Sequence, residues 1–172
     1  KAHLTGGEPF LYFDRLAEIM TEAWRLKLDN IDSIETNGFW ATDEKIIRDR
    51  LGFLDAKGMK RLKISWDPFH AEFIDEACII KLVETGRKLL TKERILVRWE
   101  KYLGHFADIK SMSEKQKIED MKESVSRYPI RFTGKAAEAF ADNFSNFTAK
   151  SLAEQNCRKS YLSAGGVHID PF

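Results

Sequence analysis

The first hundred residues alternate between two hydrophobic periods, one typical of helices and one typical of strands. From Leu11 to Arg25, apolar residues recur every three or four positions with charges between them, which predicts a helix with one buried face. A second helix is expected to begin at an N-cap, Thr42, and to end before Gly58. The same criteria predict strands at Ile31–Thr36, Arg61–Trp66 and Ile95–Trp99 and a third helix over about Phe73–Leu90. Strands that alternate with helices predict an α/β fold with parallel strands and right-handed crossovers.

A glycine turn, Thr5-Gly6-Gly7-Glu8-Pro9, precedes the first helix. Two adjacent glycines allow positive φ angles and let a ligand approach the main chain. Pro9 suits the entry to a helix, where an N–H would have no partner. Glu8 places a carboxylate at the mouth of the turn, which favours an ammonium or hydroxyl group over a phosphate. The alternative is a plain turn in which Glu8 faces solvent, and in both cases we expect Glu8 to contribute little to the fold.

Polar residues follow the predicted strands at regular intervals. Glu8, Asn37 and Asp67 are 29 and 30 residues apart, and Ser65 precedes Arg98 by 33, so each step is one strand and one helix. The carboxyl ends of parallel strands meet at one edge of a sheet, where α/β folds place their sites. We therefore expect these five side chains to converge on one pocket. Each of them also has a purely structural interpretation as a hydrogen-bonded strand-end residue.

Composition limits the classes of function. The chain has 172 residues, 43% of them hydrophobic and 32% charged, which is typical of one globular domain with a sizeable core. A net charge of +1 argues against a nucleic-acid or anionic-membrane partner. Neither a membrane-length apolar run nor a signal peptide is found, so the sequence predicts a cytoplasmic location. Two cysteines, Cys78 and Cys157, cannot form a disulfide framework.

The second half of the chain carries weaker patterns. Ser113–Arg127 is charge-rich with an apolar stripe, which predicts a solvated helix. A strand is expected at Pro129–Phe132, a helix from near Lys135, and the start of a hairpin at Val167–Asp170. Because the chain starts without Met inside a predicted strand and stops at a turn, we expect it to be a piece of a longer protein.

The order of these motifs resembles that of the radical S-adenosylmethionine (radical SAM) enzymes. The resemblance rests on Gly6-Gly7-Glu8-Pro9 after the second barrel strand, Thr36-Asn37-Gly38 after the third and Ile64-Ser65-Trp66-Asp67 at the fourth. It implies a partial (β/α)6 TIM-like barrel, truncated at its N-terminus, over residues 1–150. The cofactor-binding residues that it implies are Gly6, Gly7, Glu8 and Pro9 at the amino group of S-adenosylmethionine, Ser65 with Asp67 at the ribose or carboxylate, Arg98 at the carboxylate, and Asn37 in the same pocket.

The family holds a [4Fe-4S] cluster with a Cys-x3-Cys-x2-Cys loop after the first barrel strand, and this chain begins beyond that point. The cluster ligands are therefore expected outside this chain, which alone should not cleave S-adenosylmethionine. The resemblance implies that the longer protein forms a 5′-deoxyadenosyl radical. That radical would abstract hydrogen from a small-molecule or peptide substrate, with an electron donor such as flavodoxin or ferredoxin.

The tail, residues 151–172, resembles the start of the auxiliary-cluster extensions called SPASM or twitch. By this resemblance Cys157 would be a ligand of an auxiliary iron–sulfur cluster. Two other functions remain open from the sequence. One is a non-catalytic barrel remnant that acts as a binding or scaffold module. The other is an unrelated (β/α) barrel hydrolase or isomerase with Glu8 and Asp67 as paired carboxylates and His70 as a base.

Overall fold

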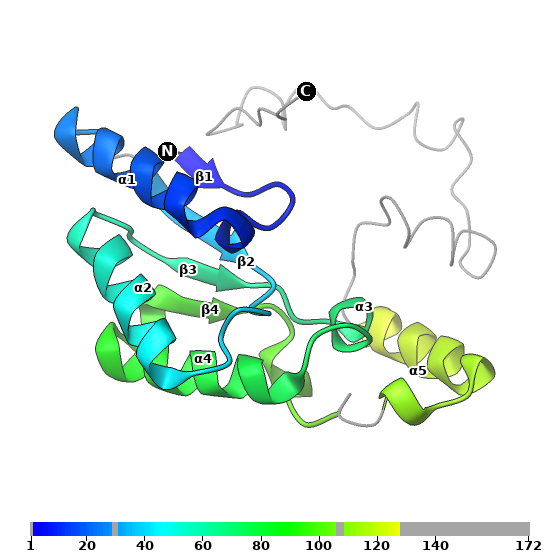
Figure 1. Cartoon of the computed structure of the whole chain (residues 1–172). Coiled ribbons are helices and arrows are strands. Elements are labelled where there is room, and N and C mark those ends of the chain that lie inside the picture. The colour runs from blue at the N-terminus through cyan, green and yellow to red at the C-terminus, as the bar shows by residue number, and fades with distance from the viewer. Residues whose placement is uncertain (1, 29–30, 106–108, 128–172) are drawn as a thin grey trace, which may run out of the picture. The chain divides into compact units, whose positions relative to one another are not determined.

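The computed structural model describes residues 2–28, 31–105 and 109–127. Four parallel strands form one sheet in sequential order, β1-β2-β3-β4 (Figure 1). The strands are β1 (Ala2–Leu4), β2 (Ile31–Thr36), β3 (Leu62–Ile64) and β4 (Ile95–Val97), and the helices are α1 (Phe13–Arg25), α2 (Glu44–Ala56), α3 (Pro68–Ala71), α4 (Glu76–Leu89) and α5 (Glu114–Arg127). Short 3-10 turns cover Pro9–Tyr12 (η1), Lys92–Arg94 (η2), Glu100–Tyr102 (η3) and Ile109–Ser111 (η4). The predicted α/β class with a parallel sheet is confirmed, and the barrel remains a prediction.

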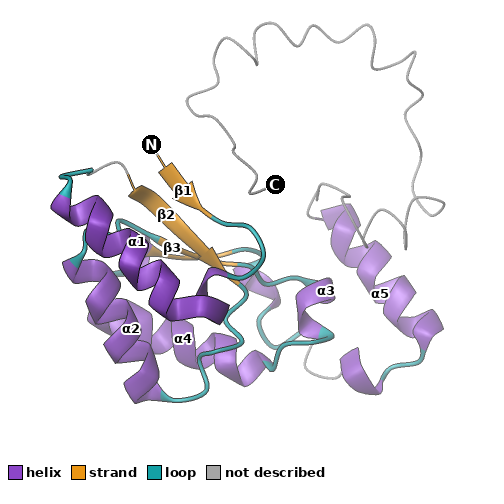
Figure 2. Cartoon of the chain, turned by 45° about the horizontal axis from the view of Figure 1, so that its top comes forward, coloured by secondary structure: helices purple, strands orange, loops and turns teal. Residues whose placement is uncertain are grey.

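Helices α1, α2 and α4 lie on the same face of the sheet (Figure 2). This follows from the strand order, because right-handed crossovers between strands added in sequence all pass on one side. The strand residues on that face are registered with one another, Ile34 with Leu62 and Leu62 with Ile95, and all three are fully buried. Gly86 of α4 packs against them so closely that a Cβ there would lie 3.0 Å from Ile95 and 3.3 Å from Leu51. The core therefore lies between the sheet and these three helices.

The opposite face of the sheet combines polar side chains with apolar ones, among them Leu96 of β4, which is registered with Lys63. Alternation along the strands places Ser33 and Glu35 of β2 and Lys63 of β3 on it, and Glu35 is registered with Lys63. His3 joins them from β1, where it is registered with Ser33. We call the face that carries these four residues the open face, because α1, α2 and α4 all lie on the other side.

Two predicted helix boundaries were wrong. Helix α2 is capped by Asp43 rather than Thr42, since the Asp43 carboxylate accepts hydrogen bonds from the amides of Lys45 (2.7 Å) and Ile46 (3.3 Å). The predicted helix from Phe73 to Leu90 starts only at Glu76, because the side chain of Asp75 caps it at the amide of Ala77. The position of Gly58 beyond α2 is confirmed, with a φ of +88°.

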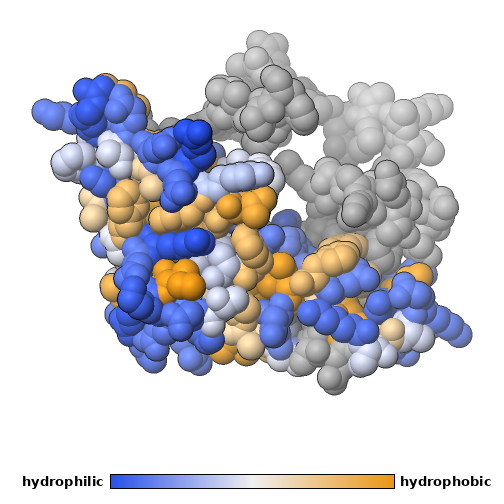
Figure 3. All heavy atoms as spheres, in the orientation of Figure 1, coloured by the Kyte–Doolittle hydropathy of each residue, from blue (hydrophilic) through white to orange (hydrophobic). Residues whose placement is uncertain are grey.

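Helix α5 confirms the helix predicted over Ser113–Arg127 and belongs to a second compact unit, distinct from that of residues 1–112. The strand expected at Pro129–Phe132, the helix from Lys135, the hairpin, Cys157 and the domain boundary at residue 150 lie outside the described residues. Apolar patches alternate with hydrophilic residues on the surface drawn in Figure 3. Among the described helices, none is both long and apolar enough to cross a membrane.

The packing predicts that Leu51→Ala in α2 lowers the free energy of unfolding by about 2–5 kcal/mol. The leucine is fully buried, so its loss removes apolar contacts and leaves a cavity. Ile46→Ala on the same helix is the matched control, since Ile46 is 38% exposed and should lose less than about 1 kcal/mol. Urea denaturation of both variants measures the difference. Equal losses would contradict the core assigned here.

Candidate functional site

The turn between β1 and η1 exposes its backbone. Gly6 has a φ of +95° and Gly7 a φ of +52°, and residues other than glycine adopt such angles only with strain. Both residues are exposed, and a Cβ built on either would meet no atom within 4 Å. The structure therefore leaves space beside this main chain, as the two adjacent glycines predict.

Glu8 does not face solvent freely, because three hydrogen bonds hold its carboxylate, and these contacts argue against the expectation that it contributes little to the fold. One of its carboxylate oxygens accepts hydrogen bonds from the amide of Phe10 (3.0 Å) and the hydroxyl of Thr36 (2.8 Å). The other oxygen accepts one from the amide of Asn37 (2.6 Å). Glu8 is thus the N-cap of η1, in which Pro9 is the first residue, and it also ties the turn to the end of β2. Its contact with an ammonium group remains a prediction.

The loop after β2 is fixed by the same group of contacts. The Thr36 hydroxyl also accepts hydrogen bonds from the amide of Gly38 (3.1 Å) and the indole of Trp40 (2.9 Å). The Asn37 side chain accepts one from the amide of Phe39 (3.0 Å). Trp40 stacks on Phe10 with ring centroids 4.3 Å apart, so the loops after β1 and β2 form one packed unit.

Asp67 follows β3 and is 5% exposed. Its carboxylate accepts hydrogen bonds from the amides of Phe69 (3.0 Å) and His70 (3.1 Å), and the Nδ1 atom of His70 lies 2.7 Å away. Burial opposes ionisation, but the hydrogen bonds and charge of His70 and the charge of Arg98 hold the pKa of Asp67 below its ordinary value. Arg98 is exposed beyond β4, and its amide extends the ladder to the carbonyl of Ile64 (2.9 Å).

A network centred on Glu35 is not among the predicted site residues. The Glu35 carboxylate accepts hydrogen bonds from the hydroxyls of Ser65 (3.0 Å) and Thr5 (3.3 Å) and lies 3.0 Å from Nε2 of His3. Burial raises the pKa of Glu35, but the hydrogen bonds from these residues and the charge of His3 outweigh it and lower the pKa overall. Glu35 lies within β2, whereas the predicted site residues lie at or beyond the ends of strands. A glutamate and a serine at alternate positions of a strand in a parallel sheet are the pattern that marks it, because such strands are usually apolar throughout.

The structure thus brings most of the predicted residues to one edge of the sheet. Glu8 accepts a hydrogen bond from the amide of Asn37, and Ser65 donates one to Glu35 beside the glycine turn. The positive charge of Arg98 lowers the pKa of Asp67. Cys157 lies outside the described residues. Cys78, on α4, is a partly buried free thiol, and burial raises its pKa. Within the described ranges, no three His, Cys, Asp or Glu side chains are grouped closely enough to hold a metal ion.

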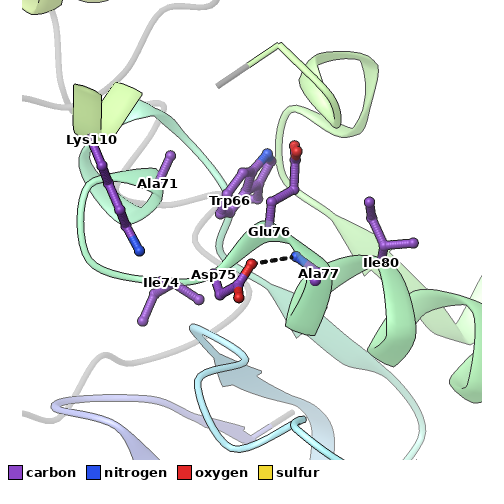
Figure 4. Close-up of a pocket in the computed structure, with 8 residues that line it drawn as sticks. All are labelled: Trp66, Ala71, Ile74, Asp75, Glu76, Ala77, Ile80 and Lys110. Atoms are coloured by element: carbon purple, nitrogen blue, oxygen red, sulfur yellow. Dashed lines mark hydrogen bonds between the residues drawn. The ribbon is translucent and has the colours of Figure 1, made fainter. Parts of the chain in front are cut away.

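A separate cavity of about 480 Å³ lies beside α3 and the first turn of α4 (Figure 4). The two carboxylates in its wall are already engaged with the backbone, since Asp75 caps α4 and Glu76 accepts a hydrogen bond from the amide of Gly104. Trp66 belongs to the motif after β3, but none of the predicted site residues lines this cavity. The lining residues are Trp66, Ala71, Ile74, Asp75, Glu76, Ala77, Ile80 and Lys110.

The geometry defines an α/β protein with a polar open face and an exposed glycine turn at the carboxyl ends of its strands. No protein-family model matches the chain. A stretch of 84 residues is 33% identical to the Bacillus subtilis (strain 168) protein named "Putative peptide biosynthesis protein YydG". That stretch is 49% of this chain and 26% of YydG, so the chain matches about a quarter of the length of this relative.

Glu8→Ala is predicted to lower the free energy of unfolding by about 1–3 kcal/mol. The change leaves the hydroxyl of Thr36 and the amides of Phe10 and Asn37 without their acceptor. Glu18→Ala is the matched control, because Glu18 is an exposed helical glutamate paired only with Arg15 at the surface and should change stability by less than about 1 kcal/mol. Urea denaturation compares the two. A loss in Glu8→Ala no larger than in the control would refute the tie between the two loops.

Asp67→Asn is predicted to destabilise the fold near neutral pH and to lose this effect in acid. Asparagine keeps the cap, so the variant isolates the charge. Because the pKa of Asp67 is lower in the folded state, its contribution is fully present above the unfolded pKa of about 3.9 and disappears as the pH falls through the folded value. The difference in unfolding free energy between wild type and variant, measured from pH 7 to pH 3, should therefore shrink toward the acid end. A difference independent of pH would contradict the charge assignment.

Proposed function

We propose that this chain is part of a radical SAM enzyme and binds S-adenosylmethionine along the carboxyl edge of its sheet. The observation that carries the proposal is the glycine turn. Its two positive-φ residues have open space beside them, and Thr5, the residue before them, reaches the polar network of the open face. A small ligand with an amino acid part and a ribose needs such a surface, since it combines close backbone approach with hydroxyl and charged groups.

In this proposal the residues divide into two groups. Gly6 and Gly7 offer the main chain to the amino acid part of the ligand, Ser65 offers a hydroxyl, and Arg98 offers an exposed guanidinium for the carboxylate. The second group, Glu8, Asn37 and Asp67, holds these elements in place, because their side chains already bind loop amides. The cofactor and a [4Fe-4S] cluster, with ligands outside this chain, supply the radical chemistry when they are bound.

The similarity to YydG supports a peptide as the substrate of the longer protein, because the name of that relative refers to peptide biosynthesis. The alternative of a non-catalytic binding module has the same cofactor site as the enzyme but lacks the [4Fe-4S] cluster. A Cys-x3-Cys-x2-Cys motif encoded upstream in the same reading frame favours the enzyme, and its absence favours the module. The hydrolase alternative has less support, since Glu8 and Asp67 each hold a loop rather than facing one another as a pair.

Gly6→Ala is predicted to weaken the binding of S-adenosylmethionine to this chain by about tenfold or more, because a methyl group would enter the space left for the ligand. Gly58→Ala is a matched control. Gly58 has a similar φ of +88° with nothing within 4 Å, and it lies after α2, away from the carboxyl ends of the strands. Isothermal titration calorimetry of the wild type and both variants gives the affinities.

Binding by the wild type and by Gly58→Ala, with loss in Gly6→Ala, is the expected result. Both substitutions introduce the same backbone strain, so a loss common to the two variants would reflect stability alone. No binding of S-adenosylmethionine by the wild-type chain would refute the proposed site.

A further inference from the structure

The Glu35 network is a built polar site centred on a residue outside the motifs, although its member Ser65 belongs to one of them. The side chain of Glu35 is 32% exposed and that of His3 31% exposed, while Ser33 beneath them is fully buried. All three lie on the open face, next to the glycine turn. The hydroxyl of Thr5, which immediately precedes Gly6, is 3.3 Å from the carboxylate. A ligand resting on the turn from the open face would therefore meet Glu35 first.

The two glutamates near the turn differ in what holds them. Glu8 accepts two backbone amides and a hydroxyl, and these contacts close the loops. Glu35 is held by side chains alone, namely two hydroxyls and an imidazole. Hydroxyl groups rotate and can also accept a hydrogen bond, so they can serve an incoming donor without disturbing the backbone. Glu35 is thus the carboxylate that can change partners.

The network leaves a negative charge on this face. An ionised carboxylate only accepts hydrogen bonds, so the neutral tautomer of His3 with its hydrogen on Nε2 satisfies the contact with Glu35. Its Nδ1 then accepts from the hydroxyl of Ser33, 2.6 Å away. His3 in its neutral form leaves the negative charge of Glu35 for a ligand, whereas a protonated His3 forms an ion pair with that carboxylate. Lys63 on β3 is registered with Glu35, and no ion pair joins the two in the described structure.

We infer that Glu35 receives the ammonium group of a primary amine bound against the Gly6–Gly7 turn. The inference rests on the proposed function and deepens it. The ammonium belongs either to the amino acid part of the cofactor or to an amine of the substrate. In both cases the amine donates hydrogen bonds to the carboxylate, with Ser65 and Thr5 beside it, and Lys63 competes for the same charge.

Glu35→Gln tests the inference, because it keeps the shape of the side chain and removes the charge. For the cofactor, calorimetry compares S-adenosylhomocysteine with methylthioadenosine, which lacks the amino acid part, so that neither probe carries a sulfonium charge. Glu35→Gln should weaken binding of S-adenosylhomocysteine by about tenfold or more and leave binding of methylthioadenosine unchanged.

For the substrate, wild type and Glu35→Gln are each saturated with methylthioadenosine and titrated with acetyl-Gly-Lys-Gly-amide and with its norleucine analogue. A loss confined to the lysine peptide assigns the ammonium to the substrate.

A second variant guards against an effect on folding. Lys63→Gln removes the competing cation and should strengthen binding of the same amine by about two- to fivefold, an effect of opposite sign that a damaged fold would not give. The inference would be overturned if Glu35→Gln weakened binding of probes with and without the ammonium equally, or if it changed neither the adenosyl pair nor the peptide pair. The proposed function would still stand in that case, provided that the wild type binds S-adenosylmethionine. Failure of the wild type to bind any adenosyl probe would refute both.

Discussion

The handedness of the crossovers is the constraint on which the rest of the structure depends. With four parallel strands added in sequence, right-handed connections place α1, α2 and α4 on one side of the sheet. The two faces of each strand then have different chemistry. Ile34, Leu62 and Ile95 bury apolar surface against the helices. The alternate positions carry the polar Ser33, Glu35 and Lys63 together with the apolar Leu96. One topological rule thus creates both the core and the polar surface beside it.

The carboxyl edge shows how loops can be fixed without closing the surface they border. Glu8 joins the turn after β1 to the end of β2 through two hydrogen bonds and caps η1 with a third, and Phe10 stacks on Trp40 across the same junction. Asp67 caps α3 after β3. Because these carboxylates bind backbone amides, the exposed glycines keep their positive φ angles and their open space. Rigid support and ligand contact are therefore assigned to different residues.

The sequence predicts the features that depend on local periodicity. The strand at Ile31–Thr36, the helix of α5, the glycine beyond α2 and the parallel alternation all follow from spacing alone. The roles of Glu8 and Glu35 do not, because their partners lie 28 to 32 residues away and become neighbours only through the strand register. The break before α4 was also missed. Both Asp67 and Asp75 are competent N-caps, and the apolar pattern from Phe73 onward does not show that the chain restarts a helix at Glu76.

The polar residues of the open face support the binding surface that we propose. Ser33 is fully buried and Glu35 partly buried, and keeping hydroxyl and carboxylate groups in such positions requires a complete network of partners. Apolar residues at the same positions would be equally compatible with a parallel sheet and would need no network. Polar residues that need hydrogen-bond partners and do not contribute to the core are expected where a protein binds a ligand. The same reasoning distinguishes Glu8, whose partners explain it fully, from Glu35, whose partners leave it accessible to one more donor.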